Sequence, residues 1–228
     1  MSESAVFLQV RLSSTRLPEK ALLPLSGRPA VFHAMAALAS LPVQHHVLLT
    51  DHDSGETLRP IAESQGFEVF VGDAENVLLR YCSAIEHYRA EVVVRATGDN
   101  PLVSSAAARE ALQLQSVTAA DYAGITETPY GTGVEVIRGP ALLDLHRRGT
   151  DRYEREHVSP GLYRRPERYR VVTRPVVERL RLPDMRVTLD TPADYEYIAE
   201  IFRELYHGRP IELPELVAYG HRYHRNSA

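Results

Sequence analysis

Residues 5–20 read AVFLQVRLSSTRLPEK, and this stretch decides how the rest of the chain is interpreted. Its first part, residues 5–10, is an apolar run typical of a buried strand. Directly after it come three cationic and three hydroxyl side chains, Arg11, Ser13, Ser14, Thr15, Arg16 and Lys20. Ligands of open α/β sheets bind outside the carboxyl ends of the strands. The stretch therefore predicts a polyphosphate site in such a sheet, and a solvated basic loop is the alternative for a cluster of this kind.

The composition of the 228-residue chain is that of an ordinary globular protein, with 44% apolar and 25% charged residues. A net charge of −4 without a long block of one sign does not favour nucleic-acid binding. No apolar run approaches the roughly 20 residues of a membrane helix, and the first residues lack the pattern of a signal peptide. The single cysteine, Cys82, lies in an apolar helical pattern, so we expect it to be buried. We expect a cytoplasmic protein.

Strand and helix patterns alternate through the first half of the chain. Strands are expected at residues 6–10, 46–50, 68–71 and 92–96, and helices at residues 30–40, 56–65 and 77–88. Asn76 is placed to cap the third of these helices. Alternation with short loops predicts an α/β fold in which helices cover both faces of a parallel sheet.

The pattern is looser after Pro101. Helices are expected at residues 105–115, 140–148 and 192–206, and short strands at residues 121–124, 134–138, 169–174 and 186–189. Thr191 and Pro192 form the start of a capped helix. We find no repeat and no linker, so we expect one domain over residues 1–228. Within it, residues 1–104 would form a nucleotide-binding half, and residues 105–228 a half that binds the acceptor and completes a metal site.

His221 and His224 stand three residues apart near the C-terminus. Such a pair is a possible metal site, but no further cysteine or histidine lies at a matching spacing. A solvated tail is the preferred interpretation.

Two aspartates follow expected strands. Asp99 stands in the stretch RATGDNPL at residues 95–102, where Gly98 lets the backbone approach a ligand closely. Asp190 directly follows the strand expected at residues 186–189. An ordinary turn or helix cap is the alternative at each position. Two carboxylates that face a basic loop suit Mg²⁺, which takes one or two protein carboxylates and completes its shell with phosphate and water. We therefore expect the two carboxylates to lie close together, to repel each other without metal and to attract cations.

The usual phosphate-binding motifs are absent. The chain has neither a P-loop sequence nor a Gly-x-Gly-x-x-Gly turn after the first strand. Phosphates would instead be held by arginine forks, by hydroxyls and by Lys20, the chain's single lysine.

Five segments, in this order, resemble the sugar cytidylyltransferases, above all the SpsF-type spore coat polysaccharide proteins. They are RLSSTRLPEK (residues 11–20), DAENVLLRY (73–81), VRATGDNPL (94–102), EREHVS (154–159) and TLDTPADY (188–195). The resemblance extends from about residue 7 to residue 205. The chain departs from the family pattern at Ser13 and Glu19, where glycine is common, and at Asn76 and Leu79, where acidic residues are common.

The resemblance implies a single-domain nucleotidyltransferase fold of the glycosyltransferase-A type, with a mixed, mostly parallel, Rossmann-like sheet of seven strands. It also implies CTP as substrate, Mg²⁺ or Mn²⁺ as cofactor, and a homodimer. Thr97 and Gly98, which directly precede Asp99, are expected to contact the nucleotide. Position by position, the resemblance implies triphosphate contacts at Arg11, Ser14, Arg16 and Lys20, nucleoside contacts at Leu8, Gln9, Thr50, Asp51 and Arg80, metal ligands at Asp99 and Asp190, and acceptor contacts at Asn100, Glu135, Glu156 and His157.

The predicted function is a CTP-dependent cytidylyltransferase for surface polysaccharide or glycoconjugate biosynthesis. It would activate a sugar, sugar acid or related small molecule as its CMP or CDP derivative and release pyrophosphate. Lys20, Arg11 and Arg16 would neutralise the leaving group. His157 would orient or deprotonate the acceptor, or else be an ordinary helix-surface histidine. The partners are small molecules, without nucleic acid or membrane. The alternatives are another nucleotide or a phosphonate-like acceptor, and a nucleotide-binding protein without turnover.

Overall fold

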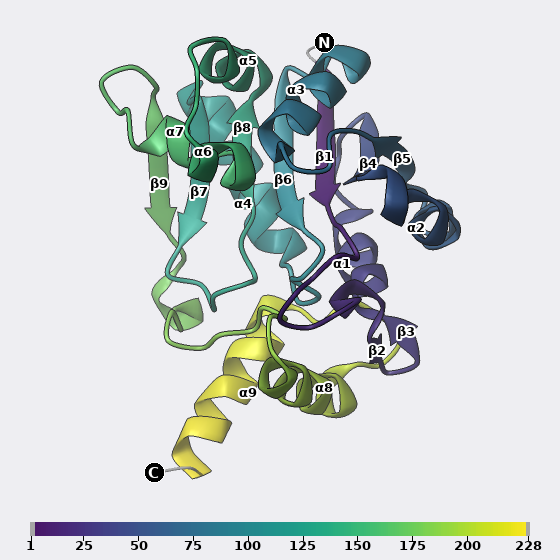
Figure 1. Ribbon diagram of the computed structural model, residues 1–228. Coiled ribbons are helices and arrows are strands. Elements are labelled where there is room, and N and C mark those ends of the chain that lie inside the picture. Colours follow the sequence, from purple (N-terminus) through teal and green to yellow (C-terminus); the bar gives the residue numbers. More distant parts are fainter. Residues whose placement is uncertain (1–2, 227–228) are drawn as a thin grey trace.

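The first strand, β1 (Ser4–Gln9), lies in the middle of the main sheet, as its apolar sequence requires. Within residues 3–226, which the computed structural model describes, this sheet has seven strands in the order β5-β4-β1-β6-β8-β7-β9 (Figure 1). Their bounds are β4 (His45–Thr50), β5 (Glu68–Val71), β6 (Val92–Thr97), β7 (Tyr122–Thr126), β8 (Glu135–Arg138) and β9 (Val171–Pro175). Strand β8 is antiparallel to β6 and β7, and the other pairs are parallel. The expected mixed, mostly parallel sheet is confirmed.

Helices cover both faces of this sheet, and two further helices lie beyond the carboxyl ends of β1 and β6 (Figure 1). The helices are α1 (Ala30–Leu38), α2 (His52–Ser64), α3 (Val77–Tyr88), α4 (Ser105–Thr118), α5 (Gly139–Arg147), α6 (Arg152–His157), α7 (Pro160–Tyr163), α8 (Pro192–Leu205) and α9 (Leu213–Asn226). Shorter elements are the hairpin of β2 (Pro24–Leu25) and β3 (Arg28–Pro29) and the 3₁₀ turns η1 (Lys20–Leu22) and η2 (Glu178–Leu180).

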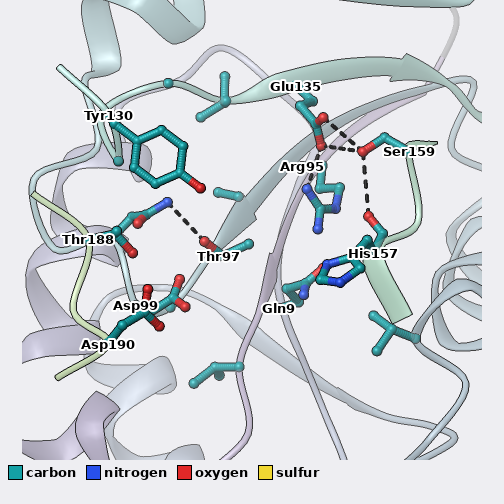
Figure 2. Close-up of a pocket in the computed structure, with 18 of the residues that line it drawn as sticks. Gln9, Arg95, Thr97, Asp99, Tyr130, Glu135, His157, Ser159, Thr188 and Asp190 are labelled. Atoms are coloured by element: carbon teal, nitrogen blue, oxygen red, sulfur yellow. Dashed lines mark hydrogen bonds and ion pairs between the residues drawn. The ribbon is translucent and has the colours of Figure 1, made fainter. Parts of the chain in front are cut away.

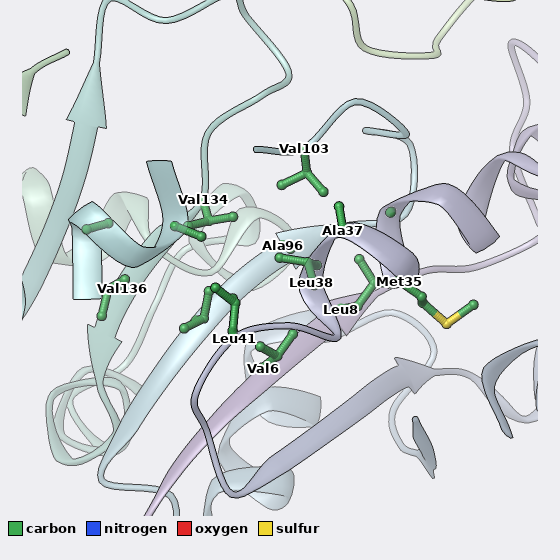
Figure 3. Packing of buried hydrophobic residues seen from close by; sticks show 14 of the residues in the cluster. Val6, Leu8, Met35, Ala37, Leu38, Leu41, Ala96, Val103, Val134 and Val136 are labelled. Atoms are coloured by element: carbon green, nitrogen blue, oxygen red, sulfur yellow. The ribbon is translucent and has the colours of Figure 1, made fainter. Parts of the chain in front are cut away.

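The alternation of side chains along β1 creates two cores. Val6 and Leu8 point to the face covered by α1 and pack in one cluster with Leu38 (Figure 3). Phe7 points to the opposite face, where it joins a second cluster that includes Leu78 of α3. Because both faces are buried, the strand carries an unbroken apolar run rather than alternating polar residues. Cys82 is buried in the second cluster, as expected, and burial raises the pKa of its thiol to about 12.

Local caps account for several helix boundaries. Asn76 accepts a 3.0 Å hydrogen bond from the main-chain N–H of Leu79, so α3 begins at the residue that the sequence predicts. Helix α2 begins four residues earlier than expected because Asp51 caps it, accepting a 2.8 Å bond from the N–H of Ser54.

The structure differs from the expected secondary structure at two places in the second half of the chain. Residues 186–189 form no ladder of the sheet, and only Arg186 makes an isolated parallel bridge, to Tyr130. The C-terminal segment, where no helix was expected, folds as α9, and its last described side chains, at residues 221–223, are exposed as expected, while the side chain of His224 lies outside the described part of the chain. His221 is exposed on α9, while Leu216 and Tyr219 are buried in a third cluster with residues of α8 and of the β2–β3 hairpin. The apolar positions of this short segment gain their partners only from the tertiary fold.

Candidate active site

A cavity of about 1010 Å³ opens at the carboxyl ends of β1 and β6 and extends over β7 and β8. The two strands end in register, with Gln9 opposite Thr97, and the chain then turns through Gly98. A Cβ atom on Gly98 would lie 2.7 Å from the Cβ of Val10, so only glycine fits this close approach of two backbones. The cavity thus forms where open α/β sheets bind ligands.

The basic loop after β1 forms one end of the cavity. All six of its cationic and hydroxyl residues line the cavity: Arg11, Ser13, Ser14, Thr15, Arg16 and Lys20. The loop is folded back on itself, because the N–H groups of Ser14 and Glu19 both donate to the carbonyl of Leu12. Glu19 adopts a left-handed conformation with φ of 51°, at the position where the resemblance predicts glycine. This turn starts η1, and Lys20 is its first residue.

The structure brings Asp99 and Asp190 together around a single cation, the ammonium group of Lys20. The Nζ atom of Lys20 donates to Asp99 Oδ2 at 2.8 Å and to Asp190 Oδ1 at 2.9 Å. Asp190 also pairs with Arg16 at 3.2 Å and with Arg186 at 2.5 Å. The two carboxylates thus lie close together and attract a cation, as expected, but their repulsion is compensated by the chain's own Lys20, Arg16 and Arg186.

The charge of Asp190 is stabilised by these cations. Burial alone would raise its pKa, but the hydrogen bond and charge of Lys20, together with Arg16 and Arg186, outweigh that effect and hold the pKa below its ordinary value. The N–H of Asp190 also donates to Asp194 Oδ2, within the capping box that starts α8. Asp190 is thus an anion at neutral pH in a fixed position.

The nucleoside residues expected from the sequence divide into two groups. Gln9, Thr97, Gly98 and Arg80 line the cavity. Leu8, Thr50 and Asp51 do not line it, because Leu8 is in the core, Thr50 is fully buried and Asp51 caps α2. Their side chains are therefore not available to a ligand in the cavity.

Arg80 is buried, with 2% of its surface exposed, and its guanidinium holds the turn before α3. Its Nε atom donates to the carbonyl of Asp73 at 2.9 Å, and an Nη atom donates to that of Ala74 at 3.3 Å. Burial lowers the pKa of Arg80, and the charge of Asp51 partly offsets this effect.

The opposite end of the cavity contains a partly buried ion pair, Arg95–Glu135, whose arginine the sequence analysis missed (Figure 2). Arg95 of β6 and Glu135 of β8 are register partners, and an Nη atom of Arg95 donates to Glu135. Glu135 also accepts from Ser159 Oγ at 2.7 and 2.8 Å and from the hydroxyl of Tyr122 at 3.0 Å. Arg95 interrupts an otherwise uncharged strand, and that interruption was the available sequence signal.

The other expected acceptor residues also line this cavity. Glu156 and His157 are exposed on α6, and the His157 ring lies against Tyr153, with 4.3 Å between ring centroids. Asn100 donates from Nδ2 to Thr97 Oγ1 at 2.9 Å. Within the described residues, Asn100 Oδ1 and Gln9 Oε1 are buried without a hydrogen-bond partner. Because buried polar atoms are normally hydrogen-bonded, and because both side chains line the cavity, a ligand toward which these side chains turn would satisfy the two oxygens.

Three tyrosines form an aromatic rim around the cavity. Tyr130, Tyr153 and Tyr163 line it, and 61%, 47% and 41% of their respective surfaces are exposed. Large exposed rings that gather at one cavity are typical of a ligand-binding surface.

The family model described as "Cytidylyltransferase" matches residues 5–219. The chain belongs to the cytidylyltransferase family. It is 32% identical over 225 residues to the spore coat polysaccharide biosynthesis protein SpsF of Bacillus subtilis (strain 168), covering 95% of this chain and 93% of that protein. It is also 28% identical over 142 residues to the 3-deoxy-manno-octulosonate cytidylyltransferase of Pectobacterium carotovorum, covering 60% and 55% of the two chains. The predicted membership is confirmed, and the chain is a nucleotidyltransferase.

Solved structures show that this cytidylyltransferase shares its fold with others. A cytidylyltransferase from Leptospira borgpetersenii superposes with a TM-score of 0.91 at 24% identity, covering 99% of this chain and 96% of that one. A CMP:2-keto-3-deoxy-manno-octonic acid synthetase complexed with CTP gives a TM-score of 0.69 at 17% identity, covering 89% and 99%. The predicted nucleotidyltransferase fold is confirmed. Among residues 3–226 of this cytidylyltransferase, no helix is both long and apolar enough to span a membrane.

The carboxylates of the cytidylyltransferase fit a divalent ion that draws further ligands from its substrate. Across the described part of the chain, no group of three or more acidic, histidine or cysteine side chains is arranged to hold a metal. Asp99 and Asp190 already share one cation, so their oxygens converge on a single point. Two carboxylates with phosphate and water oxygens make a suitable shell for Mg²⁺ or Mn²⁺.

Proposed function

We propose that the protein transfers the cytidylyl group of CTP to a sugar-type acceptor, such as a sugar or sugar acid, and releases pyrophosphate. The observation that carries this proposal is the convergence of Lys20, Asp99 and Asp190 between the basic loop and the tyrosine-lined half of one cavity. The names of the relatives support a role in surface polysaccharide or glycoconjugate biosynthesis.

The triphosphate is assigned to the basic loop. Arg11, Ser14 and Arg16 face the cavity there, and the guanidinium groups suit bidentate contacts to phosphate oxygens. Asp99 and Asp190 would hold Mg²⁺ or Mn²⁺, which when bound supplies charge neutralisation to the phosphates. Lys20 stands between loop and carboxylates, within reach of the developing charge on the leaving pyrophosphate.

The cytosine is assigned to the space near Gln9 and Arg80, beside the N-terminus of α3. Gln9 Oε1 is buried without a partner among residues 3–226, so it can accept a hydrogen bond from a base amino group. Leu8, Thr50 and Asp51 would contribute only through their main chains or by supporting the walls of the site.

The acceptor is assigned to the end with Asn100, Glu135, Glu156 and His157, where the tyrosine rim can stack against a sugar ring. Glu135 is occupied by Arg95, Ser159 and Tyr122, so it acts by fixing this wall. Glu156 and His157 are exposed and line the cavity, so they are available to an acceptor hydroxyl.

The proposed reaction is an in-line displacement. An acceptor hydroxyl oxygen forms a bond to the α-phosphorus of CTP while the bond to the bridging oxygen breaks, and pyrophosphate leaves with that electron pair. The hydroxyl proton passes to His157 or to water. Positioning and charge neutralisation account for most of the catalysis in reactions of this kind.

Pyrophosphate release tests the proposal. Purified protein is incubated with Mg²⁺, one nucleoside triphosphate and a panel of sugar acids, neutral sugars, sugar phosphates and phosphonates. We expect release with CTP and at least one sugar-type acceptor, and far less with ATP, GTP or UTP. Comparable binding of ATP and CTP in calorimetric titrations would contradict the choice of base, release only with phosphonates would change the acceptor class, and CTP binding without release from any acceptor would indicate a binding protein.

A further inference from the structure

Lys20 occupies the position where two carboxylates would share a divalent ion. Its Nζ atom lies 2.8 Å from Asp99 Oδ2 and 2.9 Å from Asp190 Oδ1, and only 16% of its side chain is exposed. The long aliphatic stem enters from η1, and the ammonium group fills the gap between the two oxygens. Lys20 is the chain's single lysine, so no neighbouring lysine can replace it.

An ammonium ion and a divalent cation are incompatible in this gap. A Mg²⁺ or Mn²⁺ ion bound to both carboxylates needs oxygen contacts of about 2.1 Å, and would have to share the space now taken by Nζ. Cations at such short separation repel each other strongly in a partly buried site. Asp190 is further compensated by Arg16 and Arg186, which reduces its attraction for an additional cation.

The basic loop supplies the means of releasing Lys20. A triphosphate bound along Arg11, Ser14 and Arg16 would bring anionic oxygens next to η1, and these would offer the ammonium group alternative partners. Lysine suits such an exchange because its charge sits on a flexible four-carbon stem. Arg16 is 69% exposed and can likewise turn from Asp190 to a phosphate.

We propose that Lys20 is an internal counter-ion that keeps divalent cations out of the nucleotide-free protein, so that the cation site opens only when nucleotide draws Lys20 away. The inference rests on the proposed function in one respect, because it takes Asp99 and Asp190 as the cation ligands. Nucleotide therefore binds before the cation or together with it.

The test is Mn²⁺ binding to the nucleotide-free protein, followed through the electron paramagnetic resonance signal of free Mn²⁺. Lys20→Met removes the charge and keeps the aliphatic stem, and Lys20→Gln serves as a second variant should the first fold poorly. We expect either variant to bind one Mn²⁺ per chain, about tenfold or more tighter than the wild type, because a competing charge has left the site. Adding Asp99→Asn to the Lys20 variant should abolish the gain, which places the bound ion at these carboxylates.

Two matched controls separate occupancy of the gap from general charge. Lys20→Arg keeps a cation at this position and should bind Mn²⁺ as weakly as the wild type. Arg16→Gln removes one charge next to Asp190 without vacating the gap, so its affinity should change far less than that of Lys20→Met. Tight Mn²⁺ binding by the wild type, no gain in the Lys20 variants, or an equal gain in Arg16→Gln would each overturn the proposal. The titration contains neither CTP nor acceptor, so failure of pyrophosphate release would not affect it.

Discussion

The main-chain N–H of Leu189 donates to the carbonyl oxygen of Asp99 at 2.8 Å. This single backbone bond joins the loop after β6 to the loop before α8, and it brings Asp190 beside Asp99 without a strand of the sheet. The preceding residues are held in the same way, since Val187 donates to the carbonyl of Tyr130 at 2.8 Å. Tyr130 in turn donates to the carbonyl of Met185 at 2.7 Å, so the position of the second carboxylate depends on main-chain bonds between loops rather than on a sheet register.

Removing either carboxylate charge should abolish turnover that depends on a divalent cation. We expect Asp99→Asn and Asp190→Asn to keep the fold, because both side chains lie at the cavity rather than in an apolar core. Turnover is measured by pyrophosphate release and folding by circular dichroism. Asp53→Asn, at a fully exposed side chain of α2, is the control and should behave as the wild type. Unchanged Mg²⁺-dependent turnover in both cavity variants would remove the proposed ligands.

Lys20→Ala should lower turnover more than it weakens CTP binding. The charge on the leaving pyrophosphate grows toward the transition state, and loss of such a contact costs about 2–4 kcal/mol, or roughly 10²–10³ in rate. Removal of the Lys20 charge should also tighten Mn²⁺ binding to the nucleotide-free protein. Turnover should therefore fall while the affinity for Mn²⁺ rises. Steady-state kinetics at saturating CTP, with calorimetric affinity, distinguish this outcome from a residue that only binds substrate.

Glu135→Ala should destabilise the protein strongly. The substitution leaves the guanidinium of Arg95 without its counter-ion, and that side chain is only 13% exposed. Breaking a fully buried pair in this way costs about 3–5 kcal/mol, and this partly buried pair should lose an amount toward the lower end of that range. The control is Glu110→Ala, whose partner Arg174 is half-exposed and whose loss should cost about 0–1 kcal/mol. Denaturant unfolding measures the free energy of unfolding of both variants. Equal losses would show that the Arg95–Glu135 pair stabilises the fold no more than an exposed ion pair does.

The contribution of Asp190 to the free energy of unfolding should be lost as the pH falls into the acid range. The folded protein holds the pKa of Asp190 below its ordinary value of 3.8, so the unfolded chain takes up the proton first as the pH falls. The contribution is complete above that ordinary value and is lost as the pH falls through the lower, folded-state pKa. The stability deficit of Asp190→Asn relative to the wild type should thus be largest near neutral pH and shrink in acid. Urea unfolding of both proteins between pH 7 and pH 2 measures it, and a deficit that grows in acid would contradict the assigned pKa shift.

Features that arise from local chemistry could be predicted from the amino-acid sequence. The apolar run of β1, the cap of Asn76 on α3 and the capping box of Thr191 and Asp194 are written in neighbouring residues, and each was formed where the pattern predicts. The order of strands and helices also predicted the sheet, because short connections leave few alternatives. The basic loop could be assigned to the cavity since it follows directly from a central strand.

The contacts between side chains that are distant in the sequence could not be predicted and are set by the folded chain. Lys20 lies 170 residues before Asp190, and no local pattern indicates that its ammonium group fills the gap between the two carboxylates. The pairing of Arg95 with Glu135 likewise requires the register of β6 on β8, and the helical C-terminus requires the apolar surface of α8. Periodicity and caps act over a few residues, whereas these contacts depend on the path of the whole chain. Burial and ion pairing depend on the distances between atoms in the folded protein, and the spacing of residues along the sequence does not give those distances.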